Sequence, residues 1–445
     1  MKSFLIKNAD IANFEDLSTT TKDILIEDGT FKKIADTIET NDYPEAELID
    51  ARNMLALPGF VDCHSHAYQT FIKGPLDDIP ITEWLVRLFT FEESMTDEDY
   101  YYATLLCCLS GLRYGTTTIN EMGGMKHIDA VYQAFKDAGV RLTYGISTTD
   151  VPENDVTPIV SIDDALKMSD FVYDKFHDKN DGLMKASVAP AGLPAVSADM
   201  AIALKKYAND KGLIYHTHLG EGKMETENVA RVYGTNGEAE ALEKLGLLDK
   251  HTLLAHSIWL SDHEIDIIAE SGAIPVHCPN TNMKISDGVP KIAQMLSKGI
   301  PVAMGCDGEA SSGTKDMIRE GRAGAYLQKG VTLDPTVMDA GTTFKMMTIN
   351  GAKALGYDDL GEIKEGYQAD LVLADLSDDL SLTDQDHRIG NLLYAGTGHA
   401  VDTVFVRGSL KLRNRKFTDF DQEEVLRKCN DMIHKLNVRT GYVKE

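Results

Sequence analysis

Candidate metal-binding side chains stand at the ends of four apolar, strand-like runs that are spread over more than half of the chain. The runs read GFVDCHSH, LIYHTHLGE, LLAHSIW and VAMGCDGE, and their candidate ligands are His64, His66, His218, His256 and Asp307. A local motif would keep its ligands close in sequence, whereas a parallel barrel gathers the carboxyl ends of its strands at one face. The spacing therefore predicts a barrel fold and a metal centre together.

Eight strand-like runs alternate with helix-like or loop segments through the middle of the chain. They cover residues 61–67, 116–122, 141–147, 184–190, 213–219, 252–258, 273–279 and 301–308. Strands that alternate with helices indicate parallel βαβ units, and eight of them favour a closed (β/α)8 TIM barrel. The long segment 68–115 after the first run is predicted to cover the catalytic face of this α/β fold.

Both ends of the chain differ from the middle, because they hold short alternating runs separated by turns. This pattern predicts one small β-sandwich domain formed from both chain ends. We expect residues 1–57 to form its N-terminal part, 58–358 the barrel, and 359–445 its C-terminal part. A terminal surface helix is predicted from Gln422 onward.

The charge balance excludes several classes of partner. With 44 basic and 70 acidic residues the net charge is −26, and such a surface repels phosphate backbones and anionic membranes. The N-terminus lacks the apolar core of a signal peptide, and ATLLCCL is too short to span a bilayer. The six cysteines form no CxxC pair, which favours buried reduced thiols. We therefore expect a cytoplasmic protein that binds neither nucleic acid nor membranes.

The residue types at the strand ends suit a catalytic metal. His64 and His66 alternate with Ser65, so both imidazoles leave one face of the strand end. His216 shares a strand face with His218 and competes with it as a ligand, although His218 lies nearer the strand end. Three imidazoles and one carboxylate leave a position for water, whose pKa a metal lowers toward ~7 to produce hydroxide. Glu221 and His256 are available to move protons and stabilise charge.

Other catalytic motifs are missing from the sequence. It contains no GxSxG elbow, no HExxH pair and no PCxxC segment of the small zinc deaminases. The stretch GEASSGTK at 308–315 has its Thr and Lys in the wrong order for a phosphate-binding loop.

The motifs PGFVDCHSHAYQT, ITEWL, HTHLGE, AHSIWL, HCPNTNMK, GCDGEAS, TINGAKALG and GEIKEGYQADLVLADL give the chain its family resemblance. With them the chain resembles the amidohydrolase superfamily, in the branch of the methylthioadenosine/S-adenosylhomocysteine deaminases and triazine chlorohydrolases. The resemblance implies a metal held by His64, His66, His218 and Asp307. It further implies that Asp307 accepts a proton from the attacking water, Glu221 protonates a ring nitrogen of the substrate, and His256 orients the hydroxide.

The resemblance also implies how many metal ions are bound. Binuclear members bridge two metals with a modified lysine at the end of strand four, where this chain has Ala189-Pro190-Ala191. Lys185 lies near the start of that run. We therefore expect one divalent ion, zinc in preference to iron(II).

The substrate-binding positions depart from those of the methylthioadenosine deaminases. Trp84 and Glu92 resemble substrate-contacting residues, and Glu121 and Tyr144 are further candidates. Tyr144 stands where those deaminases usually carry Arg, PAGLP (190–194) replaces a PHSPY-like segment, and DGEASSG replaces DGAASNN. Groups that would hold a ribose or a homocysteine carboxylate are therefore missing, which argues against a thioether nucleoside.

We expect a metal-dependent hydrolase of C–N bonds in cyclic amidines, namely a deaminase. It would replace the exocyclic amino group of a small heterocyclic substrate, such as a purine, pterin, pyrimidine or nucleoside. The alternative is a hydrolytic dehalogenase or N-dealkylase acting on an s-triazine, and the remote alternative is a non-catalytic scaffold. The enzyme is expected to form a homo-oligomer.

Overall fold

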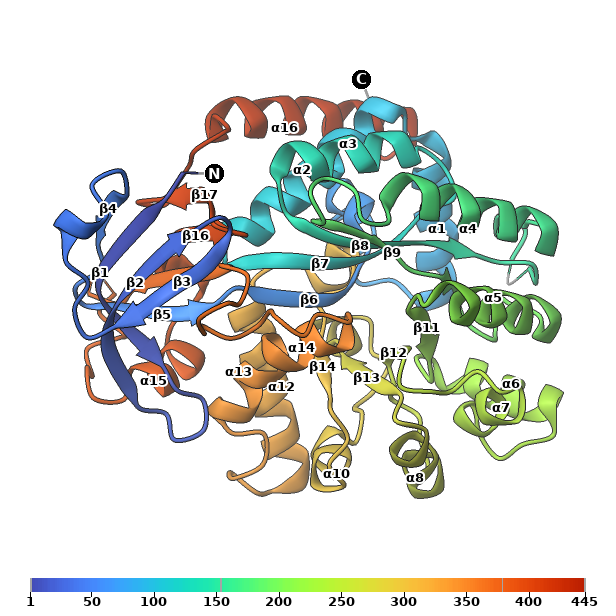
Figure 1. The fold of residues 1–445 in the computed structure, drawn as a ribbon. Helices are drawn as coiled ribbons and strands as arrows, with labels where there is room; N and C mark the ends of the chain where they lie inside the picture. The colour runs from blue at the N-terminus through green and yellow to red at the C-terminus, as the bar shows by residue number, and fades with distance from the viewer. Residues whose placement is uncertain (1, 153, 378, 444–445) are drawn as a thin grey trace. The chain divides into compact units, whose positions relative to one another are not determined.

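A computed structural model describes residues 2–152, 154–377 and 379–443 (Figure 1). The chain forms two compact units, each assembled from segments that lie far apart in sequence. The first contains Met1–Asp62, Leu109–Thr118 and Lys315–Gln422, and the second contains Cys63–Cys108, Ile119–Thr314 and Glu423–Glu445. The domain boundaries after residues 57 and 358 stay a prediction.

Nine strands from both ends of the chain form one mixed sheet in the first unit. The order is β18-β17-β16-β15-β5-β1-β2-β3, with β4 beside β1. The two chain ends join where β15 pairs antiparallel with β5, with Val372 opposite Leu57. The strands are β1 (Phe4–Ala12), β2 (Thr19–Glu27), β3 (Thr30–Ala35), β4 (Glu47–Asp50), β5 (Met54–Pro58), β15 (Leu371–Asp375), β16 (Val401–Val406), β17 (Ser409–Arg413) and β18 (Lys416–Phe417). The predicted β domain made from both chain ends is confirmed.

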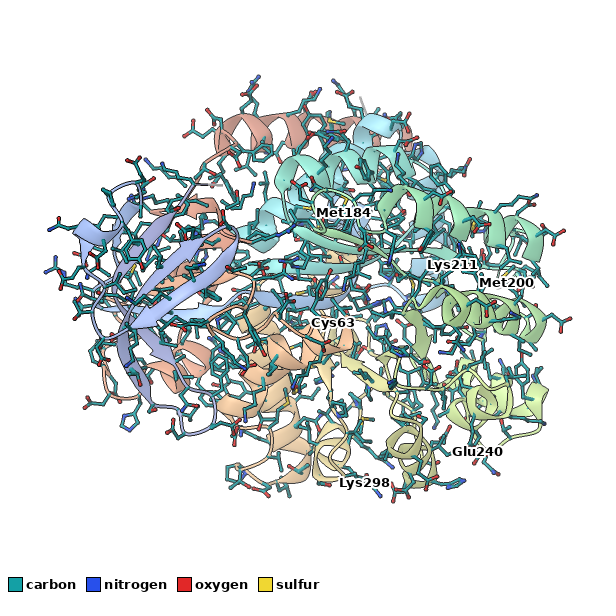
Figure 2. All side chains as sticks on the ribbon, in the orientation of Figure 1. Cys63, Met184, Met200, Lys211, Glu240 and Lys298 are labelled. Atoms are coloured by element: carbon teal, nitrogen blue, oxygen red, sulfur yellow. The ribbon has the colours of Figure 1, made fainter. Side chains whose placement is uncertain are left out.

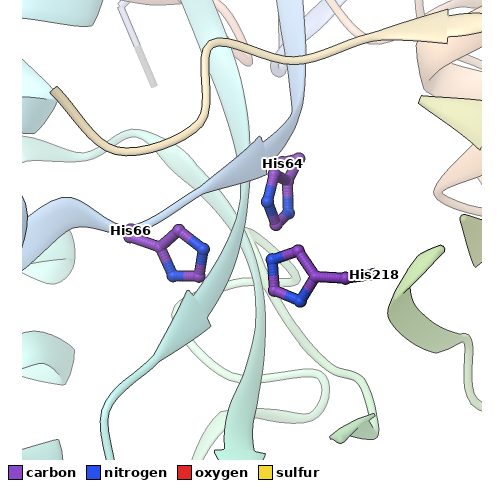
Figure 3. Close-up of side chains that lie close together, drawn as sticks. All are labelled: His64, His66 and His218. Atoms are coloured by element: carbon purple, nitrogen blue, oxygen red, sulfur yellow. The ribbon is translucent and has the colours of Figure 1, made fainter. Parts of the chain in front are cut away.

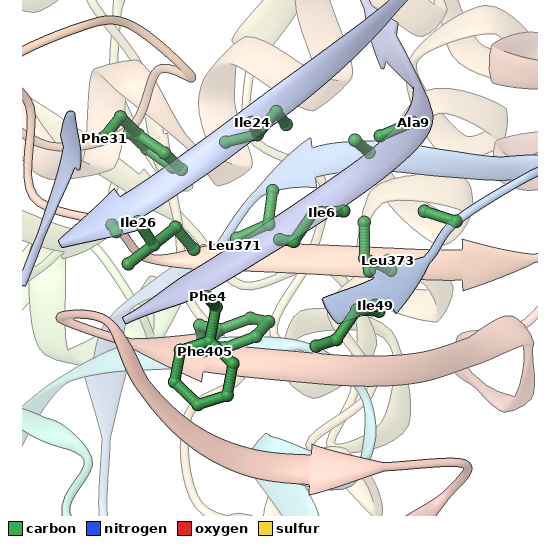
Figure 4. Close-up of a cluster of buried hydrophobic side chains, with 13 residues drawn as sticks. Phe4, Ile6, Ala9, Ile24, Ile26, Phe31, Ile49, Leu371, Leu373 and Phe405 are labelled. Carbon is green, nitrogen blue, oxygen red and sulfur yellow. The ribbon is translucent and has the colours of Figure 1, made fainter. Parts of the chain in front are cut away.

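The alternating pattern of these strands buries one set of side chains in a common core (Figure 4). Phe4 and Ile6 on β1 face the same cluster as Leu371 and Leu373 on β15, because side chains two residues apart share a strand face. Phe4 also meets the ring of Phe405 edge-on, at 5.0 Å between centroids. Strands from the two chain ends are therefore held by side-chain packing as well as by the hydrogen bonds of the sheet.

The middle of the chain forms the predicted (β/α)8 barrel, whose eight runs all become strands. β6 to β10 form one sheet and β11 to β14 another, and a parallel bridge between Val188 and Tyr215 links them. The backbone N–H of Asp307 donates to the carbonyl of His64 at 2.7 Å, which joins the end of the last strand to the first. The strands are β6 (Phe60–Ser65), β7 (Thr116–Gly123), β8 (Arg141–Thr148), β9 (Met184–Ala186), β10 (Ala189–Pro190), β11 (Tyr215–Leu219), β12 (Thr252–His256), β13 (Ile274–His277) and β14 (Ala303–Met304).

Helices follow the strands along the chain, as the alternating pattern of the sequence predicted. The excursion after β6 begins with a 3-10 turn, η2 (Ala67–Phe71), and continues with α1 and α2. The helices are α1 (Ile81–Ser94), α2 (Asp97–Arg113), α3 (Ile128–Ala138), α4 (Ile162–Phe176), α5 (Ala198–Lys211), α6 (Lys223–Tyr233), α7 (Glu238–Lys244), α8 (Asp262–Ser271), α9 (Pro279–Lys284), α10 (Ile292–Ser297), α11 (Glu309–Ser312), α12 (Met317–Thr332), α13 (Ala340–Met347), α14 (Ile349–Ala354), α15 (Arg388–Tyr394) and α16 (Gln422–Arg439). Two further 3-10 turns are η1 (Thr40–Asp42) and η3 (Gly398–Ala400).

Local residues set where several of these helices begin and end. Ser161, Ser197 and Ser261 cap α4, α5 and α8 by accepting a backbone N–H of the first turn. Ser261 and Glu264 form a reciprocal capping box. Gly272 ends α8 with a left-handed backbone (φ 74°), a conformation that glycine adopts without steric cost.

Side-chain chemistry separates the outer helices from the strands. Lys211 and Lys298 are exposed at the ends of α5 and α10, whereas Cys63 on β6 is buried (Figure 2). All six cysteines are buried.

The predicted terminal helix is present as α16, which buries Val425, Cys429, Met432 and Leu436 along one face. Among the described residues, no helix combines the length and the apolar character needed to cross a membrane.

Candidate metal and catalytic site

Three imidazoles meet at one end of the barrel strands (Figure 3). His64 lies on β6, His66 directly follows this strand, and His218 lies on β11. The ring centroid of His64 is 4.9 Å from that of His66 and 4.9 Å from that of His218. Their ligand nitrogens all lie within 4.8 Å of one another, a spacing that could hold a metal ion.

The Asp307 carboxylate follows β14 and faces the same group of imidazoles. Its Oδ1 is 3.4 Å from His64 Nε2 and 3.5 Å from His66 Nε2. Burial would raise the pKa of this carboxyl, but the neighbouring His66, His256 and His218 outweigh burial and lower it. Asp307 also adopts a left-handed backbone (φ 59°), which is uncommon for a residue with a side chain and typical of functional sites.

Backbone carbonyls orient two of the imidazoles. His66 Nδ1 lies 2.7 Å from the Met122 carbonyl, and His218 Nδ1 lies 2.6 Å from the Ala191 carbonyl. Because a carbonyl oxygen only accepts hydrogen bonds, each Nδ1 carries a hydrogen, and in a neutral imidazole of this tautomer Nε2 is the nitrogen that can bind a metal. Histidines that ligate metals are commonly held in this way. The donor set therefore fits a divalent ion.

His216 lies behind His64 and takes no part in the groups that could hold an ion. His64 Nδ1 is 3.0 Å from His216 Nε2, and His216 Nδ1 is 3.0 Å from the amide nitrogen of Asn120. Burial, followed by the neighbouring histidines, keeps the pKa of both His64 and His216 well below the usual range. Both imidazoles are therefore neutral at pH 7. This placement favours His218 over His216 as the third ligand.

His256 ends β12 and faces Glu221, which follows His218 in the next loop. His256 Nε2 is 3.5 Å from Glu221 Oε1, and His256 Nδ1 is 2.9 Å from Asn282 Oδ1. Burial opposes protonation of His256, but the carboxylates of Glu221 and Asp307 and the Asn282 hydrogen bond together raise its pKa. The site thus combines neutral imidazoles with one imidazole that favours the cationic form.

A cavity of about 220 Å³ opens in front of this cluster, inside the second unit. Its walls include His66, His218, Glu221 and Asp307. One wall comes from α1, which contributes the side chains of Ile81, Trp84, Leu85, Leu88, Phe89 and Glu92. The PAGLP segment contributes a further apolar wall with Ala191, Gly192 and Pro194, together with the adjacent Ala195. A cavity that combines apolar walls with polar side chains is typical of a site for small ligands.

The four predicted substrate-binding residues differ in position. Trp84 and Glu92 line the cavity, and Glu92 accepts a hydrogen bond from the Tyr100 hydroxyl at 2.9 Å. Glu121 and Tyr144 are not among the residues lining the cavity. Glu121 Oε1 accepts from the backbone N–H of Ala67, and the Tyr144 ring stacks on Phe176. Both are buried.

Three residues of the site had no assigned role in the sequence analysis. Asn282 is part of the HCPNTNMK motif, which pointed to this segment but not to its hydrogen bond with His256. Glu238 accepts from the backbone N–H of Gly220 at 2.9 Å, and Asp287 lines the cavity from the loop after α9. Neither carboxylate stands at a strand end or in a periodic pattern, so no sequence signal marked it.

The chain is similar to enzymes of one family along nearly its whole length. The sequence profile of the amidohydrolase family matches residues 55–411. A 5-methylthioadenosine/S-adenosylhomocysteine deaminase of Halothermothrix orenii is 32% identical, and the match covers 97% of this chain and 99% of the relative.

Two solved structures extend the comparison to the fold. An adenosine deaminase from Xanthomonas campestris with bound zinc is 27% identical, with a TM-score of 0.86 over 97% of this chain and 98% of its own. An atrazine chlorohydrolase from Arthrobacter aurescens complexed with zinc is 23% identical, with a TM-score of 0.89 over 97% of this chain and 100% of its own. The extent of the family match and of the sequence identity shows that this chain belongs to the amidohydrolase family, whose members are metal-dependent hydrolases.

Proposed function

We propose that this enzyme is a mononuclear metal-dependent aminohydrolase that deaminates a planar nitrogen heterocycle. His64, His66, His218 and Asp307 would hold the ion. The observation that carries this proposal is the convergence of three imidazoles with the Asp307 carboxylate, beside the pair formed by His256 and Glu221. The deaminase names of the relatives support the same reaction class.

We propose zinc as the metal and a single ion per chain. Zinc suits a donor set of imidazole nitrogens and one carboxylate, and two relatives of known structure contain it. Ala189 and Pro190 form β10 at the end of the fourth barrel run, so no ionisable side chain stands there to bridge a second ion. When bound, the metal would lower the pKa of a coordinated water toward ~7.

Different side chains around the ion would carry out the separate proton transfers. Asp307 would accept the proton of the attacking water, and Glu221 would deliver a proton to the ring nitrogen next to the reacting carbon. His256, whose raised pKa favours the cation, would stabilise negative charge that develops on the attacking oxygen. Asp307 would then pass its proton to the amino group, and the proton of the added hydroxyl would return to Glu221. The bond from the ring carbon to the amino group breaks, ammonia leaves, and the ring keeps the oxygen as a carbonyl.

The cavity supports a small aromatic substrate. Trp84, Leu88 and Phe89 present apolar surface from α1, which favours a flat ring over an extended polar chain. The PAGLP segment offers no hydrogen-bonding side chain to a ribose or to an amino acid tail. We therefore propose a purine, pterin, pyrimidine or small nucleoside as the substrate. The homo-oligomeric state and the cytoplasmic location stay predictions.

The fold similarity to the atrazine chlorohydrolase favours one alternative reaction. Glu221 could equally protonate the ring of a triazine while chloride or an alkylamine leaves. The two reactions differ in the product released. The zinc-loaded enzyme is expected to release ammonia from at least one member of a panel of aminopurines, aminopterins, aminopyrimidines and nucleosides. Chloride release from a chlorotriazine without ammonia release from this panel would instead establish the alternative.

A further inference from the structure

Asp287 occupies a defined position beside the proposed proton donor. It lies in the loop between α9 and α10, is only 8% exposed, and lines the same cavity as Glu221. Its backbone is anchored on both sides, because its N–H donates to the Asn282 carbonyl at 3.0 Å and its carbonyl accepts from Trp259 Nε1 at 2.8 Å. The backbone is therefore held in place by groups that do not involve the carboxyl.

One oxygen of the carboxyl has no protein partner within the described part of the chain. Its Oδ2 atom is buried and has no hydrogen-bond partner among the described residues. Another buried carboxyl of this unit behaves differently: Glu264 accepts from the backbone N–H groups of Ser261 and Ala239. Leaving a buried acceptor unsatisfied is unfavourable, so a carboxyl of this kind that lines a binding cavity is suited to take its partner from a ligand.

The charges around Asp287 indicate which partner fits. Burial, followed by the carboxylate of Glu221, raises the pKa of Asp287 to about 8. Five further carboxylates line the cavity, namely those of Glu92, Glu221, Glu225, Glu238 and Asp307. Within the described part of the chain, the lining includes no lysine or arginine. With a pKa of about 8 the free carboxyl of Asp287 is mostly protonated at pH 7. A ligand that brings an N–H donor or a positive charge would favour its ionised form, whereas an anionic ligand would be repelled.

We propose that Asp287 is a specificity-determining residue that accepts a hydrogen bond from an N–H group of the substrate. The substrate class is then a neutral or cationic heterocycle with an amino-substituted amidine edge. Its ring nitrogen would face Glu221, and its second amino group would face Asp287. This inference rests on the proposed function, because it assigns a second contact to the ring that Glu221 protonates.

Binding of a matched pair of ligands tests the inference separately from catalysis. The zinc-loaded enzyme is titrated calorimetrically with 2-aminobenzimidazole and with benzimidazole, which share the ring nitrogen and differ in the amino group. We expect the amino compound to bind about 10–100-fold more tightly, the range for a hydrogen bond to a charged group. In Asp287→Ala this preference should fall below about 3-fold, with zinc content unchanged.

Two further variants complete the experiment. Asp287→Asn keeps the shape but loses the charge, so its preference should lie between those of the native enzyme and Asp287→Ala. Both substitutions remove an unpaired buried carboxyl, and neither should lower the melting temperature. Asp266→Asn, which changes an exposed carboxylate on α8 that pairs with Lys298, serves as the control and should bind as the native enzyme does.

The outcomes separate the two levels of the proposal. Equal affinities for the two compounds in the native enzyme, or a preference that survives in Asp287→Ala, would overturn the role of Asp287 whether or not ammonia is released. A preference that depends on Asp287, found in an enzyme that releases no ammonia from any heterocycle, would support this role and reject the deaminase reaction.

Discussion

His256 and Glu221 face each other at the entrance to the group of imidazoles, with His256 Nε2 3.5 Å from Glu221 Oε1. The two residues come from different strand ends, since Glu221 follows β11 and His256 closes β12. His256 also adopts a left-handed backbone (φ 68°), so its position depends on surrounding structure that compensates for the strain. A carboxylate and an imidazole held in this way can divide proton donation and charge stabilisation between them.

Substitution of Glu221 should separate catalysis from metal binding. Glu221→Gln keeps the side-chain size but cannot donate the proton, so we expect zinc content near that of the native enzyme and a loss of about 10²–10⁴-fold in kcat. Asp307→Ala should lose both zinc and activity, because Asp307 is a proposed ligand. Metal analysis and ammonia release measured on the same preparations check this. Equal loss of zinc in the two variants would show that the roles are assigned wrongly.

Asn282 should affect the rate more than substrate binding. Its Oδ1 accepts from His256 Nδ1, which fixes the ring orientation and directs Nε2 toward Glu221. We expect Asn282→Ala to lower kcat about 10–100-fold, with KM and zinc content nearly unchanged. Asn228→Ala on α6, which removes an exposed contact with Arg231, provides the control. A rise in KM with unchanged kcat would place Asn282 in the binding wall instead.

His216 should support the metal through His64. The two imidazoles are 3.0 Å apart, and His216 is fully buried, so it can hold the His64 ring in its ligating orientation. We expect His216→Phe to weaken zinc affinity about 10–100-fold, the usual effect of losing a residue that supports a ligand. Competition with a chelator of known affinity measures this directly. Zinc affinity that stays unchanged in a folded variant would show that His64 needs no such support.

Glu238 should make stability depend on pH. Burial raises its pKa from 4.5 to about 7, which means that the folded state holds this proton more tightly than the unfolded state. The resulting stabilisation is complete below about pH 4.5 and is lost as the pH rises to about 7. In Glu238→Gln the side chain is uncharged at every pH, and its amide oxygen can still accept the hydrogen bond from the backbone N–H of Gly220.

The Glu238→Gln variant should therefore become more stable against unfolding, relative to the native enzyme, as the pH rises. Between pH 5.5 and 8 we expect its relative stability to increase by about 2 kcal/mol, seen as a rise of a few degrees in apparent melting temperature. Glu243→Gln, which is exposed on the same helix, should show no such trend. A difference between Glu238→Gln and the native enzyme that is constant with pH would refute a buried, protonated Glu238.

Local sequence patterns predicted the barrel strands and the start of the terminal helix. The apolar runs that became β6 to β14 and the start of α16 at Gln422 depend on neighbours within a few residues. The candidate ligands were recognisable for a related reason. A histidine or aspartate that closes an apolar run marks the carboxyl end of a strand, and a barrel collects these ends.

The positions around the site could not be read in the same way. His216 and His218 share a strand face in sequence, and only the hydrogen bonds to His64 and Ala191 distinguish their surroundings. Glu121 and Tyr144 lie on barrel strands as the ligands do, yet neither lines the cavity. Their orientation depends on contacts with Ala67 in η2 and Phe176 in α4, which the pattern of a single strand does not predict.

The sequence by itself determined the family, the order of strands and the candidate metal ligands, because strand periodicity and strand-end residues are local properties. Only the tertiary structure decided which side chains line the cavity and which carboxyls lack a partner. Asp287 shows the difference: in sequence it is one acidic residue of a loop, and in the fold its carboxyl lines the cavity beside Glu221. The free energy of ionising such a carboxyl depends on neighbours that long-range packing brings together and on the loss of water around the group.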